Sequence, residues 1–320
     1  MTARLQQCRR RGRRPAYVLV MVLALLVLST TLLVAVSRGA LRAAADARVA
    51  ADNLQQRWGA TSCERALLPD AEKILGALEQ ERRRPTARCA TSIRLGGVTF
   101  ELILADEQAK ANVNAILRDA DVAAAQSRLQ TALSGSGLLN RIKLRPTAGA
   151  VAGVVRGGTA PVVDDRAPAV GGWGQVFDGV SAVQLIRATP GSRTAPVDLL
   201  TCWGNGAINI RRAPEAAITL AGGRSLAGAE VSRLVEARDA LFKRQASDHS
   251  FDQDAAAGLR DLVVRTSAEV VRRRGNVGLV EGSTCHSLWV ITRTGRRDGY
   301  DLLVSDERDP ARPIVSRFSW

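Results

Sequence analysis

The longest hydrophobic run in the chain extends from Ala16 to Val36, and only the hydroxyl residues Ser29, Thr30 and Thr31 interrupt it. The run matches the roughly 20 helical residues that cross the hydrocarbon core of a bilayer. The three hydroxyls can donate to carbonyls of the preceding helical turn, so they add little unsatisfied polarity in lipid. The pattern predicts a membrane-spanning helix over residues 16–36.

The residues before this run carry a cluster of six arginines and no acidic residue: Arg4, Arg9, Arg10, Arg11, Arg13 and Arg14. The positive-inside rule keeps such a cluster in the cytoplasm and places everything after Val36 across the membrane. A cleaved secretory signal is the alternative, but Ser37-Arg38-Gly39-Ala40 is a poor cleavage site. The sequence favours a retained anchor with a cytoplasmic leader at residues 1–15.

A polar helical pattern follows the apolar run and contains no proline. The pairs Arg42/Asp46 and Arg48/Asp52 have opposite charges four residues apart, which stabilises an exposed helix. We expect this helix to continue to about residue 60, with Gly59 as its stop. A second amphipathic helix is predicted over residues 70–84.

Apolar and polar residues then alternate with the two-residue period of β-strands. Apolar residues on both sides of Gly96-Gly97 predict a β-hairpin over residues 93–104. Asn114 is expected to cap a helix over residues 115–133. Residues 145–172 show no period and predict an irregular connection.

The second half mixes helices with strands. We predict a short helix over 177–187, a strand over 199–210 with a turn at Gly204-Asn205-Gly206, and a helix that Pro214 opens and Gly222-Gly223 ends. Helices over 225–243 and 252–274 follow. Strands over 287–294, 300–305 and 314–320 predict an antiparallel meander, and the order of elements predicts an α+β fold.

These elements divide the chain into seven segments. They are a leader at 1–15, a transmembrane helix at 16–36, a stalk helix at 37–60, the first part of a head at 61–114, a helical insertion with an irregular loop at 115–200, a second strand–helix segment at 201–284 and the C-terminal antiparallel strands at 285–320.

The exported part carries four cysteines, Cys63, Cys89, Cys202 and Cys285. In an oxidising compartment four cysteines allow two disulfides with three connectivities. The pairing of sequence neighbours, Cys63 with Cys89 and Cys202 with Cys285, is favoured. Buried free thiols are the alternative, and no pair has CxxC spacing.

Candidate catalytic chemistry is scarce, and the sequence predicts that the protein is not an enzyme. The chain has two histidines, and His286 follows Cys285 directly, so that the two side chains point to opposite faces of a strand. Asp164 and Asp165 are the calcium candidates, although solvated turn residues explain them better. No other cofactor is indicated. Aromatic residues make up 4% of the chain, which argues against a stacking platform for single-stranded nucleic acid.

Two segments carry a family resemblance. The first runs from Asp106 to Asn114 and reads Asp-Glu-Gln-Ala-Lys-Ala-Asn-Val-Asn; the second runs from Gly206 to Pro214 and reads Gly-Ala-Ile-Asn-Ile-Arg-Arg-Ala-Pro. Together with the anchor they resemble the type II secretion minor pseudopilin K family. The motif positions are Asp106, Glu107, Lys110, Asn112, Asn114, Ile208, Asn209, Ala213 and Pro214. Two departures are Ala109, where the family has glycine, and Arg211-Arg212, where it has Asn-Thr.

The resemblance implies a pilin-like head with an inserted helical domain, held in the bacterial inner membrane by a single span, with the head in the periplasm. It implies a subunit at the pseudopilus tip that helps to initiate assembly, with other minor pseudopilins and the major pseudopilin as partners. Most pilin-like subunits carry a glutamate at the position that Met21 occupies here, and the members of the K family, which the resemblance places at the tip, also lack that glutamate. Processing by a prepilin peptidase would fall at Ala16, before Tyr17; Gly12 is the alternative, although Arg13 and Arg14 follow it.

The alternative function is that of a membrane-anchored DNA-uptake receptor. Residues 208–238 resemble a helix-hairpin-helix segment, which binds phosphates through backbone amides of a tight Gly-x-Gly hairpin. The hairpin here, Gly222 to Gly228, is longer than that spacing. Binding of nucleic acid is therefore disfavoured.

Overall fold

The sheet of the protein has five strands in the order β1-β2-β7-β8-β9, and every neighbouring pair is antiparallel. The structure is a computed structural model that describes residues 14–147, 168–188, 194–223, 225–247, 253–272, 278–293, 298–306 and 314–319. Two units make up the chain, Met1–Trp58 and Gly59–Trp320. We call them the anchor unit and the head.

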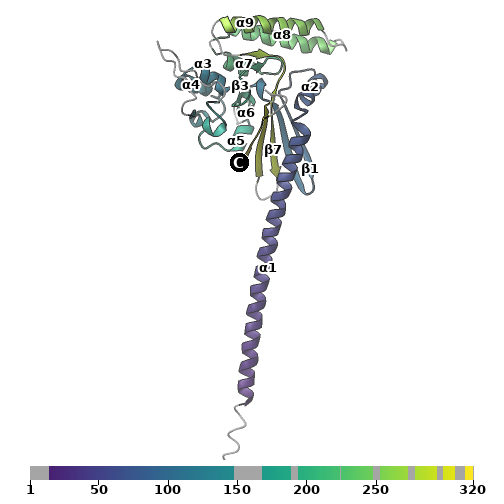
Figure 1. Ribbon diagram of the computed structural model, residues 1–320, viewed down its shortest axis with the longest axis vertical. Coiled ribbons are helices and arrows are strands. Elements are labelled where there is room, and N and C mark those ends of the chain that lie inside the picture. The colour runs from purple at the N-terminus through teal and green to yellow at the C-terminus, as the bar shows by residue number, and fades with distance from the viewer. Residues whose placement is uncertain are drawn as a thin grey trace, which may run out of the picture. The chain divides into compact units, whose positions relative to one another are not determined.

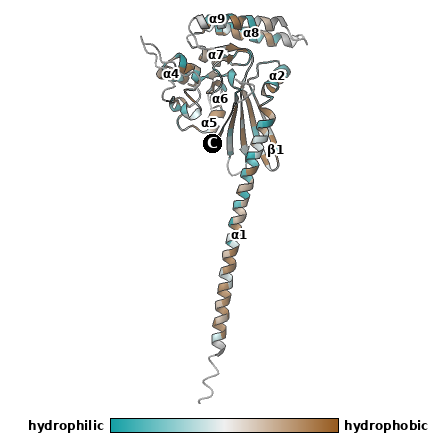
Figure 2. Cartoon of the chain, viewed as in Figure 1, coloured by the Kyte–Doolittle hydropathy of each residue, from teal (hydrophilic) through white to brown (hydrophobic). Residues whose placement is uncertain are grey.

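Helix α1 (Arg14–Leu67) begins in the anchor unit and ends in the head. Its side chains from residue 17 to residue 54 are all exposed, and its apolar part is long and apolar enough to cross a membrane. Figure 2 shows this run in brown, followed by a more polar stretch. As the sequence predicted, the hydroxyls of Ser29, Thr30 and Thr31 donate to carbonyls one turn earlier.

Gly59 does not end α1, and that prediction was wrong. The helix continues to Leu67 because its last turns pack on the sheet, and Gly59 lies under the ring of Phe100. A Cβ atom at position 59 would be 2.2 Å from Cζ of Phe100. The glycine therefore permits a close approach between helix and sheet.

The hairpin and the meander predicted from the sequence are both present. β1 (Arg88–Leu95) and β2 (Val98–Asp106) form the hairpin, and β7 (Cys285–Arg293), β8 (Asp298–Asp306) and β9 (Ile314–Ser319) form the meander. Gly96 has a φ of 61°, which suits the first central position of a type II′ turn. β7 pairs with β2 and so joins the two parts into one sheet (Figure 1).

Apolar side chains point alternately to the two faces of the central strands. Those on each face pack into a separate hydrophobic cluster. Phe100 and Leu102 of β2 share one cluster with Leu75 of α2 (Ala71–Arg82) and with the end of α1. Ile103 of β2 and Trp289 of β7 face the opposite way, into a larger cluster. The sheet thus lies between α2 on one side and a helical body on the other.

The residues between β2 and β7 in the sequence form the helical body. Its described elements are η1 (Glu107–Ala109), β3 (Ala111–Asn112), α3 (Val113–Asp119), α4 (Val122–Ala132), η2 (Leu139–Arg141), η3 (Trp173–Gln175), α5 (Ala182–Ile186), α6 (Pro196–Leu199), β4 (Leu200–Thr201), β5 (Ile208–Asn209), α7 (Glu215–Gly222), α8 (Gly228–Ser247), α9 (Gln253–Arg272) and β6 (Leu279–Val280). α8 and α9 lie side by side (Figure 1).

Three predicted elements of the body differ from those observed. The single helix expected over 115–133 is two helices, because Asp121 opens α4 by accepting from the amide of Ala124. The short helix expected over 177–187 is only the five residues of α5. The strand expected over 199–210 is split into β4 and β5, which pair in parallel with β3 and β6.

The four cysteines of the head are free thiols, which corrects the predicted disulfides. Cys63 and Cys89 adjoin the cluster under α2, and Cys202 and Cys285 belong to the larger cluster. Each thiol packs among apolar side chains without a bonded partner. Burial raises the pKa of Cys202 and of Cys285, so neither is a ready nucleophile.

Candidate functional site

The first motif segment leaves the sheet at Asp106 and forms a chain of local caps. Asp106 accepts from the amide of Ala109 at 3.1 Å and so opens η1. Asn112 accepts from the amide of Ala115 at 3.1 Å and is the N-cap of α3. The prediction that Asn114 caps this helix was wrong, since β3 ends at Asn112 and the helix begins at once.

Asn114 instead joins three segments of the head. Its Nδ2 donates to the carbonyls of Val170 at 2.9 Å and Cys202 at 2.8 Å, and its Oδ1 accepts from the amide of Val170 at 2.8 Å. Nδ2 of Asn112 donates to the carbonyl of Trp203 at 2.6 Å. Both asparagines therefore satisfy backbone groups of segments far away in the sequence.

Glu107 and Lys110 form an ion pair inside the protein, with side chains 1% and 2% exposed. The Glu107 carboxylate also accepts from the hydroxyls of Thr201 and Ser287. A buried pair loses its hydration, and further hydrogen bonds are needed to offset that loss. The pair thereby ties η1 to β4 and to β7.

The second motif segment meets the first at Asp106. Nδ2 of Asn209 donates to Oδ2 of Asp106 at 2.9 Å and to Oγ of Ser283 at 3.1 Å. The side chain of Ile208 is buried in the larger cluster. Ala213 offers its carbonyl to Arg238 at 2.6 Å, and Pro214 occupies the N-cap position of α7.

Arg212 completes this arrangement, although arginine at this position departs from the family motif. Its guanidinium lies 2.9 Å from Oε1 of Glu79, 2.5 Å from Oε2 of Glu72 and 3.3 Å from Oδ2 of Asp106. Glu79, Asp106 and Arg212 are buried. Glu72 and Glu79 lie seven residues apart on the face of α2 that carries Leu75, and this pair of acidic residues beside an apolar position is the sequence signal for a basic partner.

We call this set the motif network. Its members are Glu72, Glu79, Asp106, Glu107, Lys110, Asn112, Asn114, Thr201, Asn209, Arg212, Ser283, His286 and Ser287. It brings together two motif segments about 100 residues apart in sequence, with Asp106 bonded directly to Asn209 and Arg212. The network joins α2, the end of the sheet and the helical body.

The contacts of Glu72 and Arg212 favour the charged forms of both side chains. Burial opposes ionisation of Glu72, but hydrogen bonds with His286 and Arg212 lower its pKa to about 2. Burial also works against the charge on Arg212, yet hydrogen bonds to Glu79 and Glu72 raise its pKa. Nε2 of His286 lies 3.2 Å from Oε2 of Glu72. The charges therefore hold one another in place, as a structural junction requires.

The network contains no free ligand set for a metal ion. Within the described ranges, no group of three or more His, Cys, Asp or Glu residues is arranged to hold one. Cys285 faces the larger cluster whereas His286 faces α2, so the two do not form a nucleophile–base pair. The calcium candidates Asp164 and Asp165 lie outside the described residues. Ala16 and Tyr17 lie in α1, and cleavage there stays a prediction.

The hairpin between α7 and α8 differs from a phosphate-binding hairpin. The amides of Gly223, Ser225 and Leu226 donate to carbonyls of Thr219 and Gly222. A Cβ atom at Gly223 would lie 2.6 Å from Nη1 of Arg128, which shows how closely α4 covers the turn. These amides are engaged within the head, which counts against the DNA-uptake alternative.

No protein-family model matches the chain, and no curated protein matches it. Among solved structures, the chain is similar to a chain of the GspK-GspI-GspJ complex of the type 2 secretion system from enterotoxigenic Escherichia coli. That match has 13% identity and a TM-score of 0.40, and it covers 85% of this chain and 98% of that chain. A likeness of this degree carries no argument about function, which must come from the residues of this chain.

Proposed function

We propose that the protein is a minor pseudopilin of a type II secretion system that caps the tip of the pseudopilus and helps to initiate its assembly with other minor pseudopilins. The observation that carries the proposal is the motif network. The two segments that resemble the K family are distant in sequence, and their polar residues bond to one another at one end of the sheet. Resemblance in two unrelated surface loops would not produce such a contact.

The anchor unit supports the same proposal. An apolar helix with six arginines before it suits a single span of the inner membrane, with the leader in the cytoplasm and the head in the periplasm. There the span would pack against the spans of other minor pseudopilins and of the major pseudopilin. Met21 supports a terminal position, since a glutamate in lipid needs a partner and a tip subunit has no subunit ahead of it to provide one.

The role we assign to the motif residues is structural. Asn112 opens α3, Asn114 and Asn209 satisfy distant polar groups, and Glu107 pairs with Lys110. These contacts hold the helical body against the sheet and so give the head a fixed surface for its partners. We assign no catalytic step to any of them.

The test is co-purification of the full-length chain with pilin-like subunits of the same secretion system, after co-expression and extraction in detergent. We expect a defined complex with at least one other minor pseudopilin. Val27→Asp should abolish it, because an unpaired carboxylate in the bilayer core is costly. Val27→Leu is the matched control and should keep the complex.

The folding of the head provides the second readout. Val27→Asp should leave the thermal unfolding of the head unchanged, so that loss of the complex reports on the span alone. A complex that survives Val27→Asp, or a folded wild-type chain that binds no pilin-like subunit, would contradict the proposal.

A further inference from the structure

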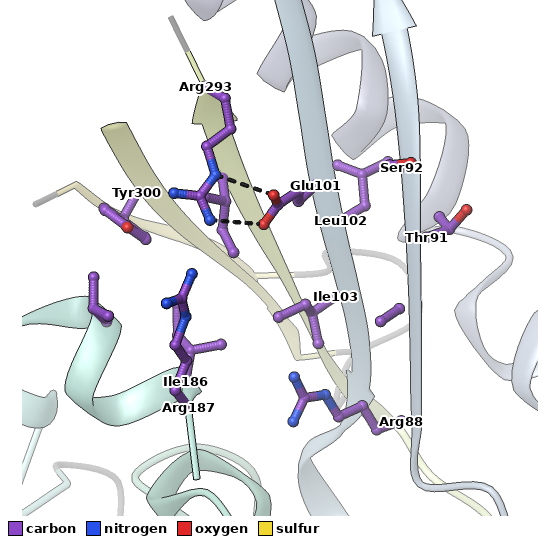
Figure 3. A pocket seen from close by; sticks show the side chains of 13 residues that line it. Arg88, Thr91, Ser92, Glu101, Leu102, Ile103, Ile186, Arg187, Arg293 and Tyr300 are labelled. Atoms are coloured by element: carbon purple, nitrogen blue, oxygen red, sulfur yellow. Dashed lines mark hydrogen bonds and ion pairs between the residues drawn. The ribbon is translucent and has the colours of Figure 1, made fainter. Parts of the chain in front are cut away.

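A pocket of about 410 Å³ opens on the face of the sheet that the helical body covers. It lies between β1, β2 and α5, with Ile103, Ile186 and Ile291 as apolar lining (Figure 3). This pocket lies away from the motif network and shares none of its side chains. Its three arginines and its position beside a sheet edge suggest a binding surface.

Two of the three arginines are neutralised by acidic neighbours. Arg293 donates to both carboxylate oxygens of Glu101 at 3.0 Å, as the dashed lines in Figure 3 show, and it also pairs with Asp298. Arg88 lies 2.6 Å from Asp198 of α6. These ion pairs frame the pocket without leaving a free charge.

Arg187 is different. It follows α5 directly, lines the pocket, is exposed, and has no ion pair within the described part of the chain. Its charge stands beside the apolar lining provided by Ile186 and Ile103. A cation next to an apolar surface suits a ligand that presents a carboxylate and an aliphatic group close together.

The pocket borders the free edge of the sheet. β1 is the first strand in the sheet order and pairs only with β2 among the described strands. The amide of Asp106 donates to the carbonyl of Ala87, which fixes the odd-numbered residues of β1 as those bonded to β2. The even-numbered residues Arg88, Ala90 and Ser92 therefore direct their backbone groups outward.

The same even-numbered residues line the pocket. A strand added to β1 would form hydrogen bonds with their backbone groups and would place every second side chain over the pocket. β1 pairs with β2 in continuous register over eight residues, and it contains no proline or bulge that would block such pairing. Its residues from Ala90 to Arg94 are exposed.

We propose that the β1 edge binds an extended segment of a partner protein as an additional strand, with acidic and aliphatic side chains alternating toward the pocket. A glutamate or aspartate of that segment binds Arg187, and an aliphatic neighbour two residues away packs on Ile103 and Ile186. Main-chain pairing supplies affinity and the pocket supplies the preference for acidic segments. The surface belongs to the head and does not depend on the assembly role proposed above.

The test uses the full-length protein in detergent and a labelled peptide of sequence Thr-Glu-Thr-Val-Thr-Glu-Thr, with anisotropy measured at low ionic strength. We expect saturable binding that weakens as salt is added. The same peptide with lysine in place of glutamate should bind at least about tenfold more weakly, since it meets an uncompensated cation. Equal binding of the two peptides, or no binding of either, would overturn the proposal.

Two pairs of variants locate the site. Ser92→Pro removes an outward amide that β2 does not use, and it should weaken binding at least about tenfold, whereas Ser92→Ala should not. Arg187→Glu should weaken binding to a similar extent, whereas Arg233→Glu, an exposed reversal on α8, should leave it unchanged. Arg187→Glu with full affinity would refute the assigned pocket.

The peptide itself provides a test that does not alter the protein. N-methylation of the amides on one edge of the peptide should abolish binding, and methylation on the other edge should not, because an added strand pairs through one edge only. This comparison holds even if Ser92→Pro fails to fold. Binding that survives both methylation patterns would mean that only the carboxylate is recognised, and the strand model would be wrong.

Discussion

The anchor unit and the head obtain their structures in opposite ways. In the anchor unit, helix α1 satisfies its own backbone and exposes its apolar side chains, so a lipid environment or partner helices must cover them. In the head, polar side chains are drawn into the interior and satisfied there by residues distant in sequence. The comparison shows that local pattern suffices for one unit and that long-range polar contacts complete the other.

Replacement of Arg212 should remove the long-range polar contacts of the head and cause the largest loss of stability. Arg212→Ala leaves the buried carboxylate of Asp106 without a cation and leaves Glu79 with only its ion pair to Arg211, and we expect the head to lose about 3–5 kcal/mol of unfolding free energy. Denaturant unfolding of the full-length protein in detergent measures this loss. The control Lys73→Ala removes only the exposed ion pair with Asp70 and should not change the unfolding free energy measurably. Equal stability of the two variants would show that the motif network does not hold the helical body to the sheet.

The two glycines of α1 provide the second comparison. Gly59→Ala forces a methyl group against the ring of Phe100, and we expect a loss of about 1–3 kcal/mol in the unfolding free energy of the head. Gly39→Ala places its methyl group in open space and should stabilise the helix by up to about 1 kcal/mol. Denaturant unfolding measures the effect of Gly59→Ala on the stability of the head. Circular dichroism in detergent measures the effect of Gly39→Ala on the helix of the anchor unit. A neutral Gly59→Ala would contradict the close packing of α1 on β2.

Much of the fold can be predicted from the periodicity of the sequence, but contacts such as that of Gly59 with Phe100 cannot. The apolar run, the β1–β2 hairpin and the C-terminal meander follow from period and turn chemistry, and all are found at or near the predicted residues. Gly59 was misread because a glycine that ends a helix and one that admits an aromatic ring look alike in sequence. The ring that decides between them belongs to β2, about 40 residues further along the chain.

The motif segments were recognisable, but their connections were not. Asp106 and Asn209 match the family motif, whereas the role of Arg212 is not visible in the motif because its partners, Glu72 and Glu79, lie about 130 residues earlier. The two-residue strands β3 and β6 were not predicted, since two residues have no period, and β4 and β5 were predicted as one longer strand. The predicted disulfides were wrong because cysteine counting gives no measure of how thiols pack.

The pH dependence of stability should sharpen the account of the network. Glu72 ionises with a pKa of about 2 in the folded head, below its ordinary value of 4.5. Its contribution is therefore fully present above pH 4.5 and is lost as the pH falls toward 2. Because the Glu72 side chain is 48% exposed, we expect its ionisation to contribute only about 1 kcal/mol to the unfolding free energy of the head. Glu72→Gln should remove that part of the pH dependence in urea titrations, and an unchanged profile would contradict the assigned contacts.

The two N-caps of α3 and α4 give the finest comparison, because the two variants are expected to differ by only about 1 kcal/mol. Asn112 caps α3 and also donates to the carbonyl of Trp203, whereas Asp121 caps α4 and makes no second hydrogen bond to a described residue. Asn112→Ala should therefore lower the unfolding free energy by about 2 kcal/mol, and Asp121→Ala by about 1 kcal/mol. Asp121→Asn keeps a capping oxygen and is the control for Asp121→Ala. If both alanine variants lose the same free energy, the bond to Trp203 adds nothing, and Asn112 acts as a local cap with no part in joining the helical body to the rest of the head.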